Sequence, residues 1–168
     1  GQEWADTLQR FGLLGWIGAQ LAAGGLDPDW TPAVVHAHDW HAALMPVYLA
    51  ARGTAGMQTR TVLTVHNLAY QGRFALERFD ELGLPAWMAG PAGIEFHGTL
   101  RLLKGGLMFA DRITTVSPTY AREILGPAEG HELDDVLRHR ADRLSGIVNG
   151  IDDAVWNPAT DRAIAATY

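Results

Sequence analysis

Apolar and polar positions alternate along the chain in two different periods. In residues 4–23, apolar side chains recur at spacings of three and four, which predicts an amphipathic helix that ends at Gly24 and Gly25. The apolar face of this predicted helix is made by Leu8, Phe11, Leu14, Ile17 and Leu21.

Four shorter runs, rich in Val, Ile and Thr, are typical of buried strands: residues 33–37, 60–66, 112–116 and 144–148. Helical patterns lie between or near them, over residues 40–52, 99–109, 118–125 and 132–140, and Ser117 is the expected N-cap of the third. Alternating strands and helices indicate right-handed crossovers and a mostly parallel sheet, so the fold class is α/β. Residues 84–98, with several Gly and Pro, are expected to form a long loop of the kind that often carries function.

The composition narrows the classes of function. The chain has 168 residues with 48% hydrophobic content, which is ordinary for a globular domain. Its net charge is −6 and neither half carries a basic stripe, which argues against a nucleic-acid or anionic-membrane partner. Without cysteine there is no disulfide, Fe–S cluster or thiolate zinc site. The longest uncharged run, residues 11–26, is shorter than the roughly 20 apolar residues of a spanning helix.

Each predicted strand is followed by a polar residue. Asp39 follows the first strand closely, His66 and Asn67 the second, Ser117 the third and Asn149 the fourth. Because parallel strands end at one edge of their sheet, and ligands bind beyond that edge, we expect these residues to form a site.

The segment H-A-H-D-W-H, residues 36–41, contains three histidines and Asp39, residue types that hold divalent metals. The binuclear hydrolase motif places its aspartate directly before the last histidine, whereas Asp39 precedes Trp40. We therefore expect no metal, and a structural role for His36 and His38 with Asp39 as a helix N-cap is the simpler interpretation. A metallohydrolase remains the least favoured alternative.

Trp40 is either a platform for sugar stacking or a packing residue, and spacing alone favours packing. His66 and Asn67 offer donors and acceptors suited to sugar hydroxyls.

Lys104 precedes Gly105 and Gly106, glycines that allow close packing of a helix on a sheet. The chain contains neither a dinucleotide fingerprint nor a P-loop, so no cofactor is expected. A triad of Ser117, His66 and Asp39 lacks the G-x-S-x-G turn.

Six segments in a fixed order resemble bacterial glycogen synthases and plant starch synthases. They are V-V-H-A-H-D-W-H-A-A-L (34–44), T-V-H-N-L-A-Y-Q-G (64–72), G-I-E-F-H-G (93–98), L-L-K-G-G-L (102–107), T-T-V-S-P-T-Y-A-R-E-I (114–124) and G-I-V-N-G-I-D-D-A-V-W-N-P (146–158). The resemblance implies a GT-B glycosyltransferase with two Rossmann-like halves. It implies transfer of glucose from ADP-glucose to the non-reducing end of an α-1,4-glucan, with retention, in the cytoplasm.

The resemblance also implies roles for individual residues. His66 would be catalytic and bind the donor glucose, with Asn149 lining the same pocket. Asp39, Trp40 and Asn67 would face the acceptor glucan. Lys104 matches a scaffolding motif of the family.

The same resemblance implies that residues 1–168 are part of an N-terminal Rossmann-like domain. The first strands, with the family's K-T-G-G-L loop, and the C-terminal half, with the groups that hold the diphosphate, are then outside this sequence, and the first residue is not Met. Since glycosyl transfer needs the leaving diphosphate stabilised, we expect these residues alone to be inactive. The alternative from another class is a maltodextrin-binding module without catalysis.

Overall fold

The computed structural model describes residues 4–53 and 59–168. Its α-helices are α1 (Thr7–Ala22), α2 (Asp39–Ala42), α3 (Leu44–Arg52), α4 (Leu102–Phe109), α5 (Pro118–Glu123) and α6 (Asp134–His139). Its strands are β1 (Val34–His38), β2 (Arg60–Val65), β3 (Arg73–Ala75), β4 (Glu95–Phe96), β5 (Thr99–Arg101), β6 (Arg112–Thr115) and β7 (Leu144–Gly146). Three 3₁₀ helices are η1 (Leu76–Leu82), η2 (Ala86–Ala89) and η3 (Ala141–Arg143).

The four predicted strands form one parallel sheet in the order β1-β2-β6-β7, which confirms the α/β fold class. The register pairs His38 with Thr64, Thr64 with Thr114, and Thr114 with Ser145. All four carboxyl ends therefore meet at one edge, as the sequence predicts. A second, antiparallel sheet of order β3-β5-β4 was not predicted, because its strands have only two or three residues each.

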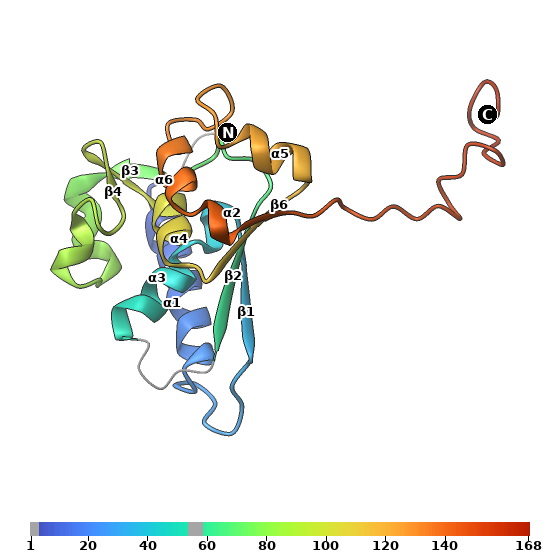
Figure 1. Cartoon of the computed structure of the whole chain (residues 1–168). Coiled ribbons are helices and arrows are strands. Elements are labelled where there is room, and N and C mark those ends of the chain that lie inside the picture. The colour runs from blue at the N-terminus through green and yellow to red at the C-terminus, as the bar shows by residue number, and fades with distance from the viewer. Residues whose placement is uncertain (1–3, 54–58) are drawn as a thin grey trace.

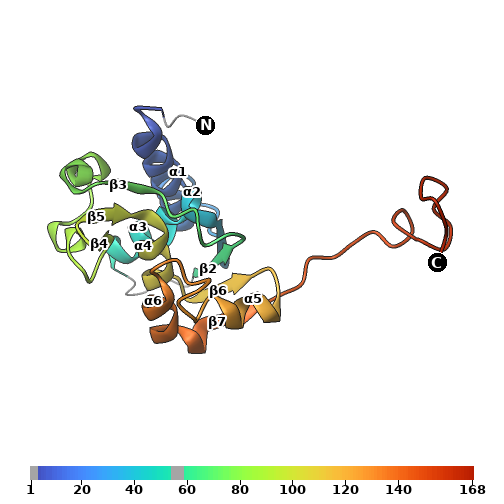
Figure 2. The same cartoon turned by 90° about the horizontal axis from the view of Figure 1, so that it is seen from above.

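The parallel sheet has two different faces. Figure 1 shows α1, α3 and α4 on the same side of β1 and β2, and Figure 2 shows the small sheet beside α3 and α4. We call the side facing these helices the covered face; it comprises Val35, Ala37, Thr61, Leu63, Val65, Ile113 and Thr115. The opposite, exposed face comprises Val34, His36, His38, Val62, Thr64, Arg112, Thr114 and Ser145.

The helix α1 forms where the sequence predicts it, but it buries only the first part of the predicted face, where Leu8 is fully buried and Phe11 partly buried. Leu14, Ile17 and Leu21 are exposed, whereas the helix packs through small residues such as Gly12 and Gly15. A Cβ at Gly15 would lie 2.8 Å from the Leu44 Cβ, so α3 approaches too closely for a large side chain. The spacing of large apolar residues therefore predicted the contact face correctly at Leu8 and Phe11 and wrongly at Leu14, Ile17 and Leu21.

Other boundaries differ from the prediction in small ways. The helix predicted over residues 40–52 is two helices, α2 and α3, which adjoin at Ala43. The helix predicted over 99–109 begins only at Leu102, because residues 99–101 form β5. Ser117 caps α5 as predicted, since its Oγ accepts a hydrogen bond from the Tyr120 N at 2.9 Å.

The loop of residues 84–98 is packed into the core. Met88 and Ile94 are fully buried, and the Lys104 Nζ donates to the carbonyl oxygens of Pro91 and Gly93 at 2.5 and 2.6 Å. Burial lowers the pKa of Lys104, an effect that nearby Glu95 partly offsets. Lys104 thus fastens the loop to α4, which agrees with the scaffolding role that the resemblance implies.

Beyond β7 the chain extends away from the body, as the red segment of Figure 1 shows. Ile151, Val155 and Trp156 are exposed there. In the part of the chain that the structure describes, no helix combines the length and the apolar character needed to cross a membrane.

Candidate functional site

Asp39 and His66 form a two-point contact at the carboxyl edge of the sheet. The Asp39 Oδ1 accepts a hydrogen bond from the His66 backbone N at 2.8 Å, and the Asp39 Oδ2 lies 2.9 Å from the His66 Nδ1. The side chains are 27% and 44% exposed respectively, so the pair is reachable by a ligand. The sequence placed both residues at this edge but did not predict that they contact each other.

The role predicted for Asp39 as an N-cap is wrong. Asp39 is the first residue of α2 and its φ is +53°, while His38 occupies the cap position without a side-chain cap bond. A non-glycine residue at positive φ is uncommon and marks a locally constrained backbone. That conformation turns the Asp39 carboxylate toward β2 instead of the helix terminus.

Three imidazole rings stack beside one another, from the exposed face to its carboxyl edge. The ring centroids of His36 and His38 are 4.2 Å apart, and those of His38 and His66 are 5.4 Å apart. A groove of about 560 Å³ is lined by all three and by Asn149, which follows β7. The structure therefore brings His66 and Asn149, the two residues predicted for the donor glucose, into one groove.

His36 also begins a hydrogen-bonded line of side chains across the exposed face. Its Nε2 lies 2.6 Å from the Thr64 Oγ1, which in turn lies 2.6 Å from the Thr114 Oγ1. Partial burial lowers the pKa of His36, and the neighbouring His38 and His66 lower it further. The neutral imidazole is therefore favoured at this position.

The histidines do not assemble into a metal centre. Within residues 4–53 and 59–168, no three His, Asp or Glu side chains are grouped as a metal ion would require. The Ser117 hydroxyl is the cap of α5, and no hydrogen bond among the described residues joins it to His66. The arrangements needed for a metallohydrolase and for a serine hydrolase are thus both missing from the described part.

Trp40 is a partly buried packing residue rather than a free platform. Its ring lies 4.8 Å from that of Phe11, edge-on, and 4.1 Å from that of His41. A Cβ at Gly72, where φ is +61°, would come within 2.4 Å of the indole, so the loop after β2 closes over this ring. Only part of the Trp40 surface remains for a ligand, as the spacing argument favoured.

Tyr70 is an exposed aromatic that the sequence analysis did not single out. It is 66% exposed, and its backbone N donates to the Asn67 carbonyl oxygen at 3.3 Å. Asn67 is itself exposed, and its Oδ1 accepts from the Ala69 N at 2.9 Å, which leaves the Nδ2 donors for a ligand. The position of Tyr70 in a strand-end loop was the signal that could have found it.

A hydrogen-bonded network, buried at Gln71 and Arg101, packs against the loop that carries Tyr70. The amide of Gln71 accepts from the Arg101 Nη1 at 2.7 Å and donates to the His131 carbonyl oxygen at 2.7 Å. Arg101 also pairs with Glu132 at 2.7 Å, and this hydrogen bond lowers the pKa of the Glu132 carboxyl. No local pattern could reveal the network, because its members lie about 30 and 60 residues apart along the chain.

The sequence model of the starch synthase catalytic domain family matches residues 1–139. The glycogen synthase of Leptothrix cholodnii is 60% identical over 169 residues, which cover 97% of this chain, and that of Variovorax paradoxus is 57% identical over 168 residues, which cover 99%. In both cases the match covers 34% of the relative. The chain therefore spans about a third of the length of these curated relatives.

A solved structure with the same fold is the catalytic domain of starch synthase IV from Arabidopsis thaliana bound to ADP and acarbose. The TM-score is 0.79 at 30% sequence identity, and the match covers 99% of this chain and 34% of that one. The likeness thus extends over the whole described fold, including the edge that carries Asp39 and His66.

Proposed function

The chain belongs to the family of starch synthase catalytic domains, and we propose that the protein transfers glucose from ADP-glucose to the non-reducing end of an α-1,4-glucan. We propose further that the anomeric configuration is retained, that the fold is one half of a GT-B enzyme and that the protein acts in the cytoplasm. The ADP and acarbose of the starch synthase IV structure are of the nucleotide and sugar chemistry that these substrates require.

The observation that carries the proposal is the groove that His66 and Asn149 share at the carboxyl edge of the sheet. In an open parallel sheet this edge is where ligands bind. An imidazole and a carboxamide offer the mixture of donor and acceptor groups that sugar hydroxyls need. We assign both side chains to the donor glucose, with His66 next to the reacting centre.

The acceptor glucan is assigned to the neighbouring loop. Asn67 offers its Nδ2 there, and the exposed part of Trp40 and the ring of Tyr70 offer apolar surface to the sugar faces. Asp39 belongs to the same edge through its contact with His66.

We propose that residues 1–168 alone do not transfer glucose. The chain spans 34% of the length of its relatives, and the transfer needs the charge of the departing diphosphate to be stabilised. Loss of a single hydrogen-bond donor that stabilises such charge typically lowers the rate by about 10²–10³.

The test is a chimera in which residues 1–168 replace the matching third of the Leptothrix cholodnii glycogen synthase. We expect the chimera to transfer glucose from ADP-glucose to maltoheptaose, as measured by radiolabel incorporation. The new glycosidic linkage should have the α configuration, as measured by NMR. The isolated chain is the control and should show no transfer. A folded chimera without activity would contradict the proposal, whereas saturable maltoheptaose binding without transfer would favour a binding module.

A further inference from the structure

We infer that Asp39 is a positioning residue that fixes His66 in its Nδ1–H tautomer, so that the bare Nε2 accepts a hydrogen bond from a sugar hydroxyl. This inference rests on the proposed function for the identity of the ligand. Its structural part, the tautomer, is independent of that function.

The two-point contact leaves little freedom to the imidazole. A carboxylate only accepts hydrogen bonds, so the Nδ1 that faces the Asp39 Oδ2 at 2.9 Å must carry the proton. The second bond, from the His66 backbone N to Oδ1, prevents the carboxylate from turning away. The stacked ring of His38, 5.4 Å away between centroids, limits rotation of the His66 ring.

With Nδ1–H facing Asp39, the neutral form of the ring has a bare Nε2, because an imidazole with its proton on one nitrogen accepts at the other. Among the described residues no hydrogen bond engages this nitrogen, and His66 lines the groove with Asn149. A ligand hydroxyl at His66 must therefore be a donor. The neutral ring thus selects a hydroxyl over a group that only accepts.

The backbone conformation of Asp39 is of a kind that is typical of functional sites. A φ of +53° is disfavoured for a residue with a side chain, and strain of this kind concentrates at functional sites. Both carboxylate oxygens are engaged by His66. Through these two bonds Asp39 acts on the sugar by way of His66, in addition to the glucan-facing role that the resemblance implies.

The test is the tautomer of His66, read from its imidazole ¹⁵N shifts in labelled chain at a pH where the ring is neutral. A His66→Gln sample assigns the signals among the seven histidines. We expect a protonated Nδ1 and a bare Nε2 in the unaltered chain. A protonated Nε2 there would overturn the inference without any variant.

The Asp39→Asn variant sharpens the test because it keeps the shape of the side chain. Its carboxamide oxygen can still accept from the His66 backbone N, which directs the NH₂ group toward Nδ1. We expect the proton to move to Nε2, and an unchanged tautomer would contradict the inference. Asp39→Ala, which removes both contacts, should also favour the Nε2–H form and serves if the asparagine variant does not fold.

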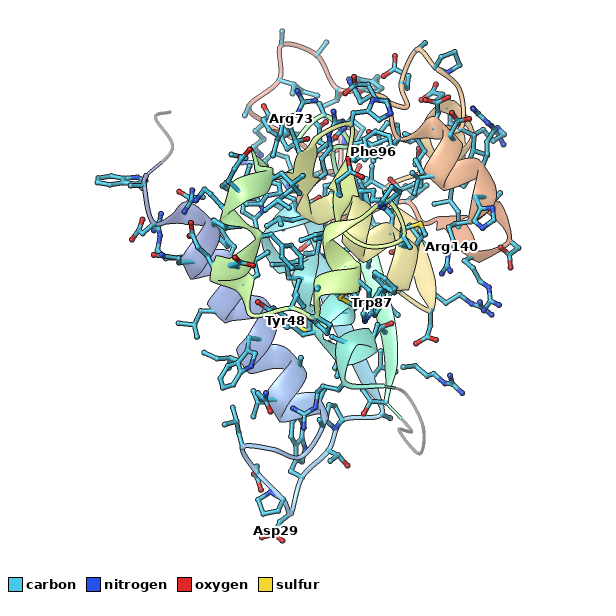
Figure 3. The ribbon with its side chains drawn as sticks, turned by 90° about the vertical axis from the view of Figure 1, so that its left-hand side faces the viewer. Asp29, Tyr48, Arg73, Trp87, Phe96 and Arg140 are labelled. Atoms are coloured by element: carbon cyan, nitrogen blue, oxygen red, sulfur yellow. The ribbon has the colours of Figure 1, made fainter. Side chains whose placement is uncertain are left out.

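Asp27→Asn is the matched control. The Asp27 Oδ1 accepts from the Asp29 N in the loop after α1, and Figure 3 shows Asp29 at the opposite end of the molecule from Arg73, which follows the loop after β2. This variant should leave the His66 signals in place. A shift of these signals in the control would show that the asparagine effect is not specific to Asp39.

In the active chimera, Asp39→Asn should lower kcat about 10- to 100-fold, because the Nε2–H form can no longer accept from the sugar hydroxyl and the hydroxyl must reverse its hydrogen bond. Adding it to His66→Ala should change kcat little, because Asp39 affects kcat through His66. Additive losses would overturn the positioning role. An inactive chimera with the expected tautomers would instead defeat the proposed function alone.

Discussion

The covered and the exposed face of the parallel sheet come from the same four strands, but they differ in burial and in the chemistry of their side chains. Leu63 and Ile113 of the covered face are fully buried against helices, whereas Val62 and Thr114 next to them keep part of their surface. The exposed face carries polar and titratable side chains linked to each other. Alternate residues of one strand therefore separate the stability of the fold from the chemistry near its edge.

The largest effect should come from truncating Leu63 in β2, and its neighbour Val62 on the other face gives the comparison. Leu63→Ala removes a fully buried side chain and should lower the free energy of unfolding by about 2–5 kcal/mol. The side chain of Val62 lies on the exposed face, so Val62→Ala should lower the free energy of unfolding by about 1 kcal/mol or less. Urea unfolding followed by tryptophan fluorescence measures both, and equal losses would mean that the exposed face is covered in solution.

Gly106→Ala tests how closely α4 packs on the covered face. A Cβ at Gly106 would lie 2.8 Å from the Ala43 Cβ and 2.9 Å from the Leu63 Cδ2, both too short for a stable contact. We expect a loss of about 1–3 kcal/mol from overpacking, despite the better helix propensity of alanine.

The matched control for Gly106→Ala is Gly90→Ala. A Cβ at Gly90 would approach nothing closer than the Trp87 carbonyl oxygen at 3.8 Å, so this change should have little effect. If Gly106→Ala were equally harmless in the same urea titration, α4 would pack less closely than the structure indicates.

The covered face was largely predictable from the sequence, because its strands are short apolar runs and their ends are clear. The edge of the sheet followed from that prediction, since parallel strands end together. The contact face of α1 was not predictable in the same way. Its contact is set by how closely Gly15 lets α3 approach, a distance that periodicity does not encode.

The site was predictable as a set of positions but not as a set of contacts. Asp39, His66 and Asn149 were placed at one edge, yet the pairing of Asp39 with His66 depends on the positive φ of Asp39. Nothing in the segment H-D-W-H distinguishes that conformation from an ordinary N-cap. The Gln71–Arg101–Glu132 network also depends on tertiary placement.

A smaller difference should separate Thr115 from Thr114, neighbours in β6 that face opposite sides. The Thr115 Oγ1 is buried and donates to the Val65 carbonyl oxygen at 2.7 Å, so Thr115→Val should cost about 1–2 kcal/mol. Thr114→Val loses a partly exposed bond to Thr64 and should change stability by about 0.5 kcal/mol or less. The reverse order in urea unfolding would contradict the assignment of the two faces.

The smallest effect is the pH dependence that His36 gives the exposed face. Partial burial and the neighbouring His38 and His66 hold the pKa of His36 below 6.5 in the folded chain. Between the folded pKa and 6.5 the unfolded chain binds more protons, so stability is complete above pH 6.5 and declines as the pH falls through the folded pKa. Because His36 is exposed, solvent screening should keep this contribution below about 1 kcal/mol.

The measurement is the free energy of unfolding of the unaltered chain and of His36→Gln across pH 5 to 8. Glutamine does not titrate but can still hydrogen-bond Thr64. The difference between the two curves isolates His36 from His38, His66 and Arg112, which line the same groove. We expect the unaltered chain to lose more stability toward pH 5 than the variant. The difference in slope should correspond to less than one extra proton bound by the unfolded chain. Parallel curves would mean that the exposed face leaves the proton affinity of His36 as it is in the unfolded chain.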